Sequence, residues 1–174
     1  MMHFSKQGGF TLLETIVSMA ILVILTCIGL PNIHDLLLKY RMQNDMLSYK
    51  HYVHLTRHHA ITHTALVTFC PLVEKRCKLT DWGQSPTIFV DINGNSELDQ
   101  DEKVIHIGES LREYIEFEYP RKAITFRPDG TPKGLHNGTF TYCIKLLNGE
   151  KVGQSLSLNH SGRTKLRDEL KCEE

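Results

Sequence analysis

Hydrophobic positions divide the chain into an apolar run near the N-terminus and a longer, more polar remainder. Residues 1–9 are polar and lightly basic, and residues 10–30 follow as an apolar stretch whose one charged residue is Glu14. A helix rises about 1.5 Å per residue, so this stretch spans roughly 30 Å, the thickness of a bilayer core. The pattern predicts a transmembrane helix over residues 10–30.

Two other kinds of N-terminal signal do not fit this apolar run, and a third stays open. A secretory signal peptide would end in a small-x-small cleavage site, which does not follow the run. A lipoprotein signal would place a small residue before Cys27, where Thr26 stands. A plain signal anchor stays open, although it gives no reason for an acid in the membrane. In that interpretation Glu14 is an interfacial acid, and the helix dipole lowers the cost of its charge.

Helical periodicity continues after Pro31 to about residue 63. The apolar positions that approximate one stripe are Ile33, Leu36, Leu37, Tyr40, Leu47 and Val53. The opposite face carries Lys39, Arg41, Asp45 and Lys50. We therefore expect the helix to extend over residues 31–63 and to pack its apolar stripe on the domain that follows.

Histidines crowd the end of this predicted helix, at positions 51, 54, 58, 59 and 63. His54 and His58 are four residues apart, as are His59 and His63, so each pair shares a helix face and has the spacing of a two-ligand metal site. No acid or cysteine at matching spacing completes either site. The alternative is a solvated surface that becomes charged at acid pH.

Short apolar segments alternate with turn residues over residues 64–174. The segments that we expect to form strands are 65–69, 87–91, 104–107, 115–119, 123–127, 139–147 and 156–159. The dipeptides that we expect to form turns are Asp129-Gly130, Asn137-Gly138, Asn148-Gly149 and Ser161-Gly162. The predicted fold class is α+β: a long N-terminal helix, with a membrane half and an amphipathic half, packed on an antiparallel β-sheet domain.

The balance of charges and the absence of known catalytic motifs argue against several classes of function. The chain has 20 basic and 20 acidic residues, so its formal net charge is zero and gives no reason to expect nucleic-acid binding by the whole molecule. No glycine-rich phosphate loop, nucleophile elbow or metalloprotease motif occurs, and nothing marks one cysteine as a nucleophile. We therefore predict that the protein is not an enzyme and needs no cofactor, apart from the calcium considered below.

The segment from Gly8 to Glu14, GGFTLLE, resembles the class III prepilin signal. The resemblance implies that prepilin peptidase, the processing partner, removes residues 1–9 as a leader by cutting after Gly9, and then N-methylates Phe10. It also implies that Glu14 pairs with the N-terminal amine of a neighbouring pilin, which removes the cost of a carboxylate in lipid. Pro31 falls where pilins often have a helix-kinking proline.

The remainder of the chain resembles the FimT/GspH family of minor pilins and pseudopilins. The residues that carry this resemblance are Arg57, Ala60 and Ile61, Val67 to Pro71, Cys77, Trp82, Phe89 to Asp91, Asn93 to Asn95, Phe126 to Gly130, Gly138 to Phe140, Cys143 and Ser161 to Arg163. The resemblance implies a pilin fold with a single-pass anchor in the bacterial inner membrane. It further implies that residues 64–174 form a globular domain in the periplasm, with other pilins or pseudopilins as partners.

Four cysteines, Cys70, Cys77, Cys143 and Cys172, lie in this predicted periplasmic domain. An even number in an oxidising compartment favours two disulfides, and four cysteines allow three pairings. We favour Cys70–Cys77, which closes a short loop, and Cys143–Cys172, which ties down the C-terminal tail. Zinc binding is the alternative, although the spacing contains no CxxC.

Residues 91–102 approximate the spacing of a twelve-residue calcium loop. The side chains at its first, third, fifth, ninth and twelfth positions are Asp91, Asn93, Asn95, Asp99 and Glu102. Ser96 occupies the sixth position, where glycine is expected, and the loop follows a predicted strand rather than a helix. Two interpretations stay open: a calcium site and an acidic hairpin loop.

Arg163, Lys165 and Arg167 alternate after the Ser161-Gly162 turn and would share one face of a strand. Such a row can follow the phosphates of double-stranded DNA without reading bases. FimT-type members of the family contact DNA through a GRxR-like motif, but Lys165 stands in place of its second arginine and cannot hold a phosphate through two bonds. The acidic residues that follow are Asp168, Glu169, Glu173 and Glu174. In the alternative interpretation, these charges protect a sheet edge from pairing.

The resemblance implies two non-enzymatic functions. In the first, the chain is a minor pilin or pseudopilin that helps to initiate or cap a type IV pilus or a type II secretion pseudopilus. In the second, it is a pilus-associated minor pilin that binds DNA for uptake in natural transformation. The two functions differ in whether the basic row binds DNA.

Overall fold

The computed structural model describes residues 9–170 and Cys172, and it divides the chain into two units, residues 1–37 and residues 38–174. Helix α1 (Leu12–His63) contributes to both units. The strands described in the second unit are β1 (Val67–Val73), β2 (Arg76–Cys77), β3 (Pro86–Val90), β4 (Val104–Ile107), β5 (Glu116–Glu118), β6 (Ile124–Phe126), β7 (Gly138–Lys145), β8 (Lys151–Leu158) and β9 (Thr164–Leu170).

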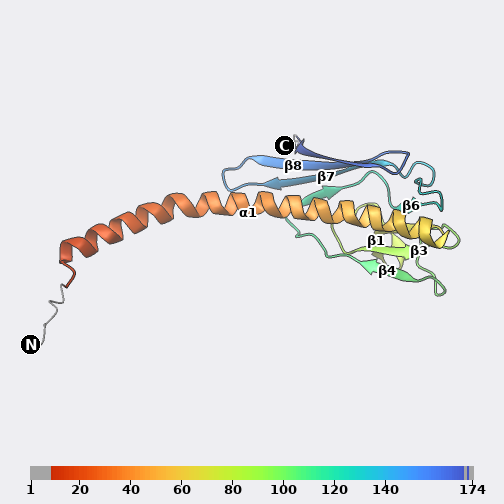
Figure 1. Ribbon diagram of the computed structural model, residues 1–174, viewed down its shortest axis with the longest axis horizontal. Helices are drawn as coiled ribbons and strands as arrows, with labels where there is room; N and C mark the ends of the chain where they lie inside the picture. The colour runs from red at the N-terminus through yellow and green to blue at the C-terminus, as the bar shows by residue number, and fades with distance from the viewer. Residues whose placement is uncertain (1–8, 171, 173–174) are drawn as a thin grey trace, which may run out of the picture. The chain divides into compact units, whose positions relative to one another are not determined.

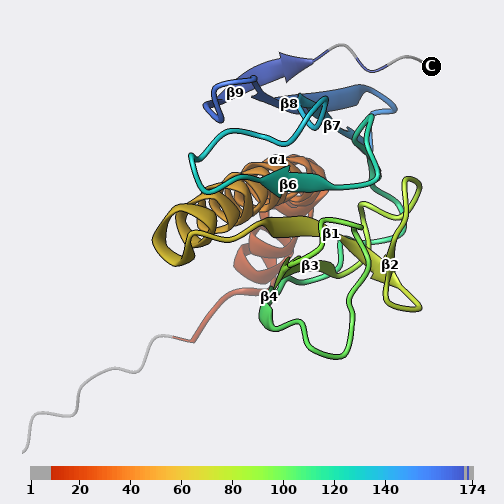
Figure 2. The ribbon, with the colours of Figure 1, turned by 90° about the vertical axis from the view of Figure 1, so that its right-hand side faces the viewer.

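These strands form two sheets in which the neighbouring strands are antiparallel. The first sheet has the order β2-β1-β3-β4, and β6 pairs with the Val67–Phe69 part of β1. The second sheet has the order β5-β7-β8-β9. In Figures 1 and 2 the two sheets lie on either side of the part of α1 that belongs to the second unit. The predicted α+β class is confirmed, with two sheets around one helix.

The helix face that enters this core differs from the predicted stripe. The apolar helix residues of the second unit that are buried are Leu38, Met42, Met46, Tyr49, Val53 and Ala60. They recur at intervals of three, four or seven residues, as one side of a helix requires. Val53 was assigned correctly, but Tyr40 and Leu47 are 56% and 50% exposed, so their predicted packing on the domain is wrong. The predicted positions Ile33, Leu36 and Leu37 belong to the first unit.

Aromatic rings connect the helix to both sheets. The ring centroid of Tyr49 on α1 lies 6.0 Å from that of Phe69 on β1, 4.4 Å from Phe117 on β5 and 5.5 Å from Phe140 on β7. Trp82, which is fully buried, stacks edge-on against Phe69 and Phe140 and donates its indole N–H to the carbonyl oxygen of Arg121. Rings of this size bury much apolar surface, so this cluster holds the two sheets together through the helix.

Helix α1 ends in a left-handed residue that is not glycine. The backbone N–H of Ala65 donates to the carbonyl oxygen of Ala60 at 3.2 Å, and Thr64 between them has a φ of 51°. This is the hydrogen-bond pattern of a Schellman cap, with Thr64 at the position where glycine is usual. The helix end predicted near His63 is therefore confirmed and has a defined terminus.

Strand boundaries differ from the predicted ones where the local signal was weak. Strand β8 begins at Lys151, five residues before the predicted start at residue 156. The prediction missed this part of the strand because Gly153, Gln154 and Ser155 lack the apolar alternation that marks a strand. Gly138 begins β7 instead of forming a turn with Asn137. The turns at Gly130, Gly149 and Gly162 are present, and each glycine has a φ between 74° and 87°. Beyond the last turn, residues 164–170 form the edge strand β9.

Candidate functional site

The first unit presents the predicted processing point immediately before the helix. Gly9 and Phe10 are exposed and non-helical, and α1 begins at Leu12. Residues 1–8 of the predicted leader lie outside the described residues. The Gly9–Phe10 peptide bond thus lies outside the helix, and cleavage at this bond stays a prediction.

Glu14 closes a capping box with Thr11 at the start of α1. The Thr11 N–H donates to Glu14 Oε2 at 3.4 Å, and the Glu14 N–H donates to Thr11 Oγ1 at 3.3 Å. In such a box each side chain satisfies a backbone donor that the first helical turn leaves free. Glu14 therefore has a structural role within its own chain, which the sequence analysis did not consider.

Apolar side chains of the first unit are exposed along α1. They include Leu12, Ile16, Met19, Leu22 and Leu25, which are 58–78% exposed. Among the described residues, no helix is both long enough and apolar enough to cross a membrane. The predicted membrane segment, residues 10–30, includes Ile28 and Leu30, whose side chains lie outside the described residues, as does that of Pro31.

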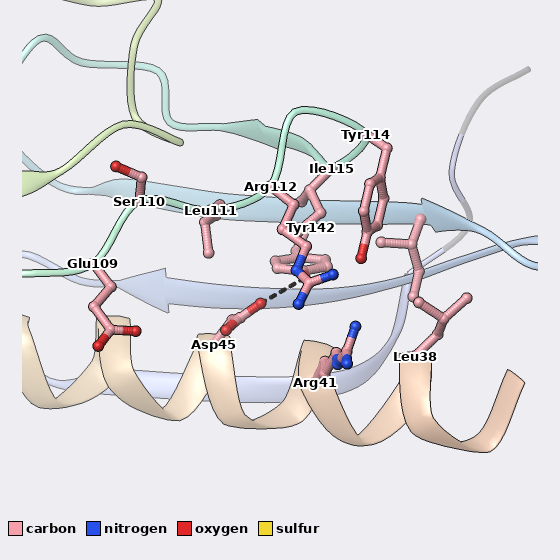
Figure 3. A pocket seen from close by; sticks show the side chains of 11 residues that line it. Leu38, Arg41, Asp45, Glu109, Ser110, Leu111, Arg112, Tyr114, Ile115 and Tyr142 are labelled. Carbon is pink, nitrogen blue, oxygen red and sulfur yellow. Dashed lines mark hydrogen bonds between the residues drawn. The ribbon is translucent and has the colours of Figure 1, made fainter. Parts of the chain in front are cut away.

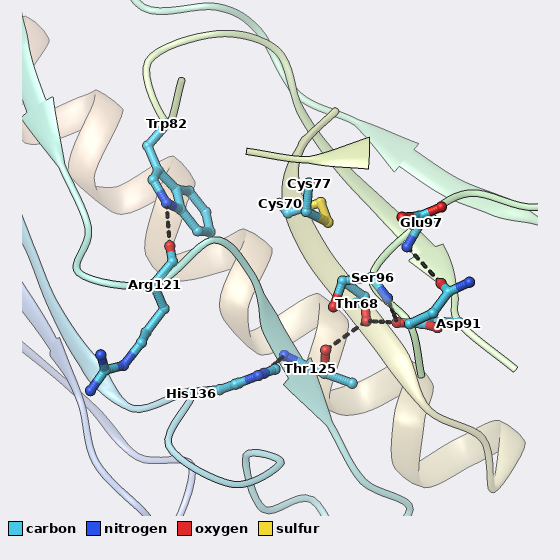
Figure 4. The surroundings of a disulfide bond; sticks show 11 residues. Thr68, Cys70, Cys77, Trp82, Asp91, Ser96, Glu97, Arg121, Thr125 and His136 are labelled. Carbon is cyan, nitrogen blue, oxygen red and sulfur yellow. Dashed lines mark hydrogen bonds between the residues drawn. A yellow bond between two sulfur atoms is a disulfide. The ribbon is translucent and has the colours of Figure 1, made fainter. Parts of the chain in front are cut away.

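The second unit contains two disulfides with the favoured pairing. Cys70 and Cys77 join β1 to β2 with an S–S distance of 1.97 Å (Figure 4), and Cys143 on β7 joins Cys172 of the C-terminal tail with an S–S distance of 1.99 Å. Cys27 of the first unit is a free, exposed thiol. The four cysteines of the second unit are all disulfide-bonded, so their sulfurs are not available as ligands for the alternative zinc site.

The predicted calcium loop folds around hydrogen bonds of its own. The amide groups of Asn93 and Asn95 both donate to Asp99 Oδ2, at 2.8 and 3.1 Å. Glu102 accepts the backbone N–H groups of Ile92 and Asp99 through its two carboxylate oxygens. The structure thus brings the five predicted side chains into one loop, but most of their oxygen atoms bond to protein donors.

Asp91 anchors this loop to the core. It is fully buried, and its Oδ2 accepts the Thr68 hydroxyl at 2.6 Å and the Ser96 N–H at 3.2 Å (Figure 4). Its Oδ1 has no partner among the described residues. Ser96 has a φ of 63°, so it adopts the left-handed conformation that the sixth position of a calcium loop requires. The sequence disfavours this conformation, because serine stands where glycine is expected. Within the described residues no group of three or more His, Cys, Asp or Glu side chains is arranged to hold a metal. Calcium binding stays a prediction.

Two residues of the predicted basic row, Lys165 and Arg167, lie on the edge strand β9 of the second sheet, and Arg163 immediately precedes this strand. Arg163, Lys165 and Arg167 are all exposed, whereas Leu166 between them packs against the core. Ser157 and Ser155 of β8 pair with Lys165 and Arg167. Ser155 is buried, and the Ser157 hydroxyl is 3.1 Å from Thr139 Oγ1, with which it shares a hydrogen bond. An open groove of about 620 Å³ at this corner is lined by Arg163, Lys165 and residues of β7 and β8.

A polar pocket between α1 and the segment after β4 escaped the sequence analysis. It has a volume of about 220 Å³, and Arg41, Asp45, Arg112 and Tyr142 are among its lining residues (Figure 3). The Tyr142 hydroxyl donates to Asp45 Oδ2 at 2.7 Å. Burial raises the pKa of the Asp45 carboxyl, and the Tyr142 hydrogen bond and the Arg112 and Arg41 charges oppose this rise. Asp45 was assigned to the solvent face, and that assignment is wrong.

Comparison with protein families gives two matches along the chain. Residues 4–26 match the prokaryotic N-terminal methylation motif. Residues 50–162 match the family described as Type II transport protein GspH, which is more than half of the chain. The chain belongs to the GspH family. The predicted relationship to GspH and FimT proteins is confirmed.

Solved structures of pilins share the fold of this GspH-family protein. Two crystal structures of the type IV minor pilin FimU from Pseudomonas aeruginosa superpose with TM-scores of 0.56 and 0.54 at 19% and 20% identity. The superpositions cover 74% and 72% of this chain, and 89% and 91% of FimU. Comparison with the curated proteins found no match. The fold is therefore a pilin fold.

Proposed function

We propose that this GspH-family protein is a minor pilin or minor pseudopilin that helps to initiate or cap a type IV pilus or a type II secretion pseudopilus. The observation that carries the proposal is the union, in one chain, of a methylation motif at residues 4–26 and a GspH domain at residues 50–162. A leader-linked apolar helix and a globular head are the parts that a helical fibre of pilins needs. An enzymatic role finds no support in the family or in the fold.

In this proposal, residues 10–30 anchor the chain in the bacterial inner membrane and residues 64–174 lie in the periplasm. Prepilin peptidase cuts the exposed Gly9–Phe10 bond and methylates Phe10. The Glu14 carboxylate is then next to the new N-terminus and bonds to its own Thr11 N–H. On assembly the carboxylate exchanges this weak contact for the charged amine of a neighbouring subunit, which is a stronger partner in lipid.

Expression of the full chain with and without prepilin peptidase tests the first step of this proposal. We expect mass spectrometry to find mature protein that begins with N-methylated Phe10 only when the peptidase is present. We expect a Gly9→Val variant to remain a precursor and to be missing from the sheared fibre fraction. Protein that enters the fibres with residues 1–9 intact would contradict the proposal.

A DNA-binding minor pilin is the second candidate, and one observation favours it. Arg163, Lys165 and Arg167 form an exposed row at the edge of the second sheet. Such cations hold phosphates by charge without reading sequence. Asp168 accepts the Gln154 side-chain amide at 3.3 Å, which holds this nearby acid toward the neighbouring strand.

A gel shift of the full chain in detergent with double-stranded DNA tests the second candidate. We expect binding that weakens steeply with salt and is lost when Arg163, Lys165 and Arg167 are replaced together by Ala. Replacement of Lys39, Lys75 and Lys103 by Ala removes the same charge elsewhere and serves as the matched control. Binding that survives the first triple variant, or no binding by the unmodified chain, would contradict this candidate. The role as a structural subunit would then be the remaining proposal.

A further inference from the structure

The structure separates the two histidine pairs that the sequence left equivalent. His54 Nε2 lies 3.0 Å from Thr164 Oγ1, so this nitrogen already has a hydrogen-bond partner. In the second pair, the imidazole rings of His59 and His63 face each other with centroids 5.3 Å apart and planes inclined by 14°. No hydrogen bond engages either ring among the described contacts, so the second pair retains free nitrogen lone pairs.

The separation of these two rings suits one shared metal ion. An imidazole nitrogen binds zinc at about 2.0–2.1 Å, so two rings that share one tetrahedral ion have centres roughly 5 Å apart. The centroids of His59 and His63 already have this separation. The χ2 torsion of histidine is broad, so the rings can turn their nitrogens toward one point without a change in the backbone.

The surroundings of the pair also favour a cation. His63 is the last residue of α1, and the unpaired carbonyls at a helix C-terminus carry partial negative charge. The Schellman cap through Ala60 and Ala65 fixes this last turn, so both ligands stand on a defined backbone.

We propose that His59 and His63 bind one divalent transition-metal ion of the class that includes Zn²⁺. Imidazole nitrogens suit this class, whereas Mg²⁺ and Ca²⁺ prefer oxygen ligands. Because the described residues supply no third His, Cys, Asp or Glu ligand, water completes the coordination. The site therefore lies at the C-terminal end of α1. It is independent of the proposed roles in pilus assembly and DNA binding.

Isothermal titration of the full chain in detergent with ZnCl₂ tests this site, with MgCl₂ as the oxygen-preferring comparison. We expect saturable binding of Zn²⁺ and none of Mg²⁺. Two ligands on one helix act as a chelate, so His59→Ala and His63→Ala should each weaken Zn²⁺ binding about tenfold or more, and the double variant should add little further loss. His51→Ala, an exposed histidine two turns earlier on the same helix, is the matched control and should bind as the unmodified chain does.

Circular dichroism of each variant establishes that it is folded, since both positions are on the helix surface. Histidine ring resonances give a second reading: those of His59 and His63 should shift with Zn²⁺, and those of His51 should not. Absence of saturable Zn²⁺ binding would overturn the proposal. Binding that survives the double variant, or that falls equally in His51→Ala, would also overturn it.

Discussion

Gly153 of β8 lies directly against the sulfur of Cys172. A Cβ atom built on Gly153 would be 2.5 Å from Cys172 Sγ, 2.7 Å from the carbonyl oxygen of Tyr142 and 3.2 Å from Cys143 Sγ. The strand therefore needs a residue without a side chain where the C-terminal tail crosses it. The bulge in the β8–β9 pairing between Gly153 and Ser155 lies at this same point.

Gly153→Ala should therefore destabilise the domain by about 1–3 kcal/mol, because backbone and disulfide atoms must move to admit a methyl group. Urea unfolding of the oxidised protein measures this cost. Gly83→Ala is the matched control, since its new Cβ would meet only Leu111 Cβ at 4.0 Å. Equal stability of the two variants would show that the tail can shift freely away from β8.

Glu14→Gln separates the two roles of Glu14. Glutamine also closes a capping box, so the helix start and the processing after Gly9 should be retained. The charge that pairs with a neighbouring amine is lost, and we expect the fraction of mature protein in sheared fibres to fall at least about tenfold. Immunoblots of the fibre and membrane fractions measure this ratio. Thr11→Ser keeps both the cap and the charge, and it should assemble normally; assembly of Glu14→Gln at the unmodified level would leave only the capping role.

The loop at residues 91–102 should hold its conformation without calcium, because its amides and backbone N–H groups already occupy most of its side-chain oxygens. We expect the unfolding temperature of the full chain to be the same in calcium and in EDTA. Asp91→Ala should destabilise the fold by about 1–3 kcal/mol, since it leaves the buried Thr68 hydroxyl and Ser96 N–H without their acceptor. A rise in unfolding temperature with calcium, absent in Asp99→Ala, would establish the calcium site instead.

Asp45→Asn should change the pH dependence of stability. Because the folded state raises the pKa of Asp45 above its ordinary value of 3.8, the stability contributed by this residue falls as pH rises from 3.8 through the raised folded pKa. Asparagine does not titrate, and its amide oxygen can still accept the Tyr142 hydroxyl. The stability of Asp45→Asn relative to the unmodified chain should therefore increase from acid to neutral pH in denaturant titrations. Asp101→Asn removes an exposed charge as a control; the same trend in both variants would contradict the prediction.

Local sequence determined the parts of this protein that depend on neighbours along the chain. The GGFTLLE segment, the turns at Gly130, Gly149 and Gly162, and the apolar runs of β1, β3 and β4 each carry their signal within a few residues. The short Cys70–Cys77 loop is a local feature of the same kind. The α+β class and the pilin fold follow from the order of these signals.

Tertiary structure alone decided which helix face is buried and what the polar residues do there. Tyr40 and Met46 are both apolar enough for a core, and only the positions of the two sheets bury the second and expose the first. Asp45 is drawn inward by Tyr142, which is 97 residues away in sequence, and His54 is paired by Thr164, which is 110 residues away. Periodicity describes a helix as a cylinder with faces, but the partner that selects a face comes from distant strands, and their contacts leave no mark on the local pattern.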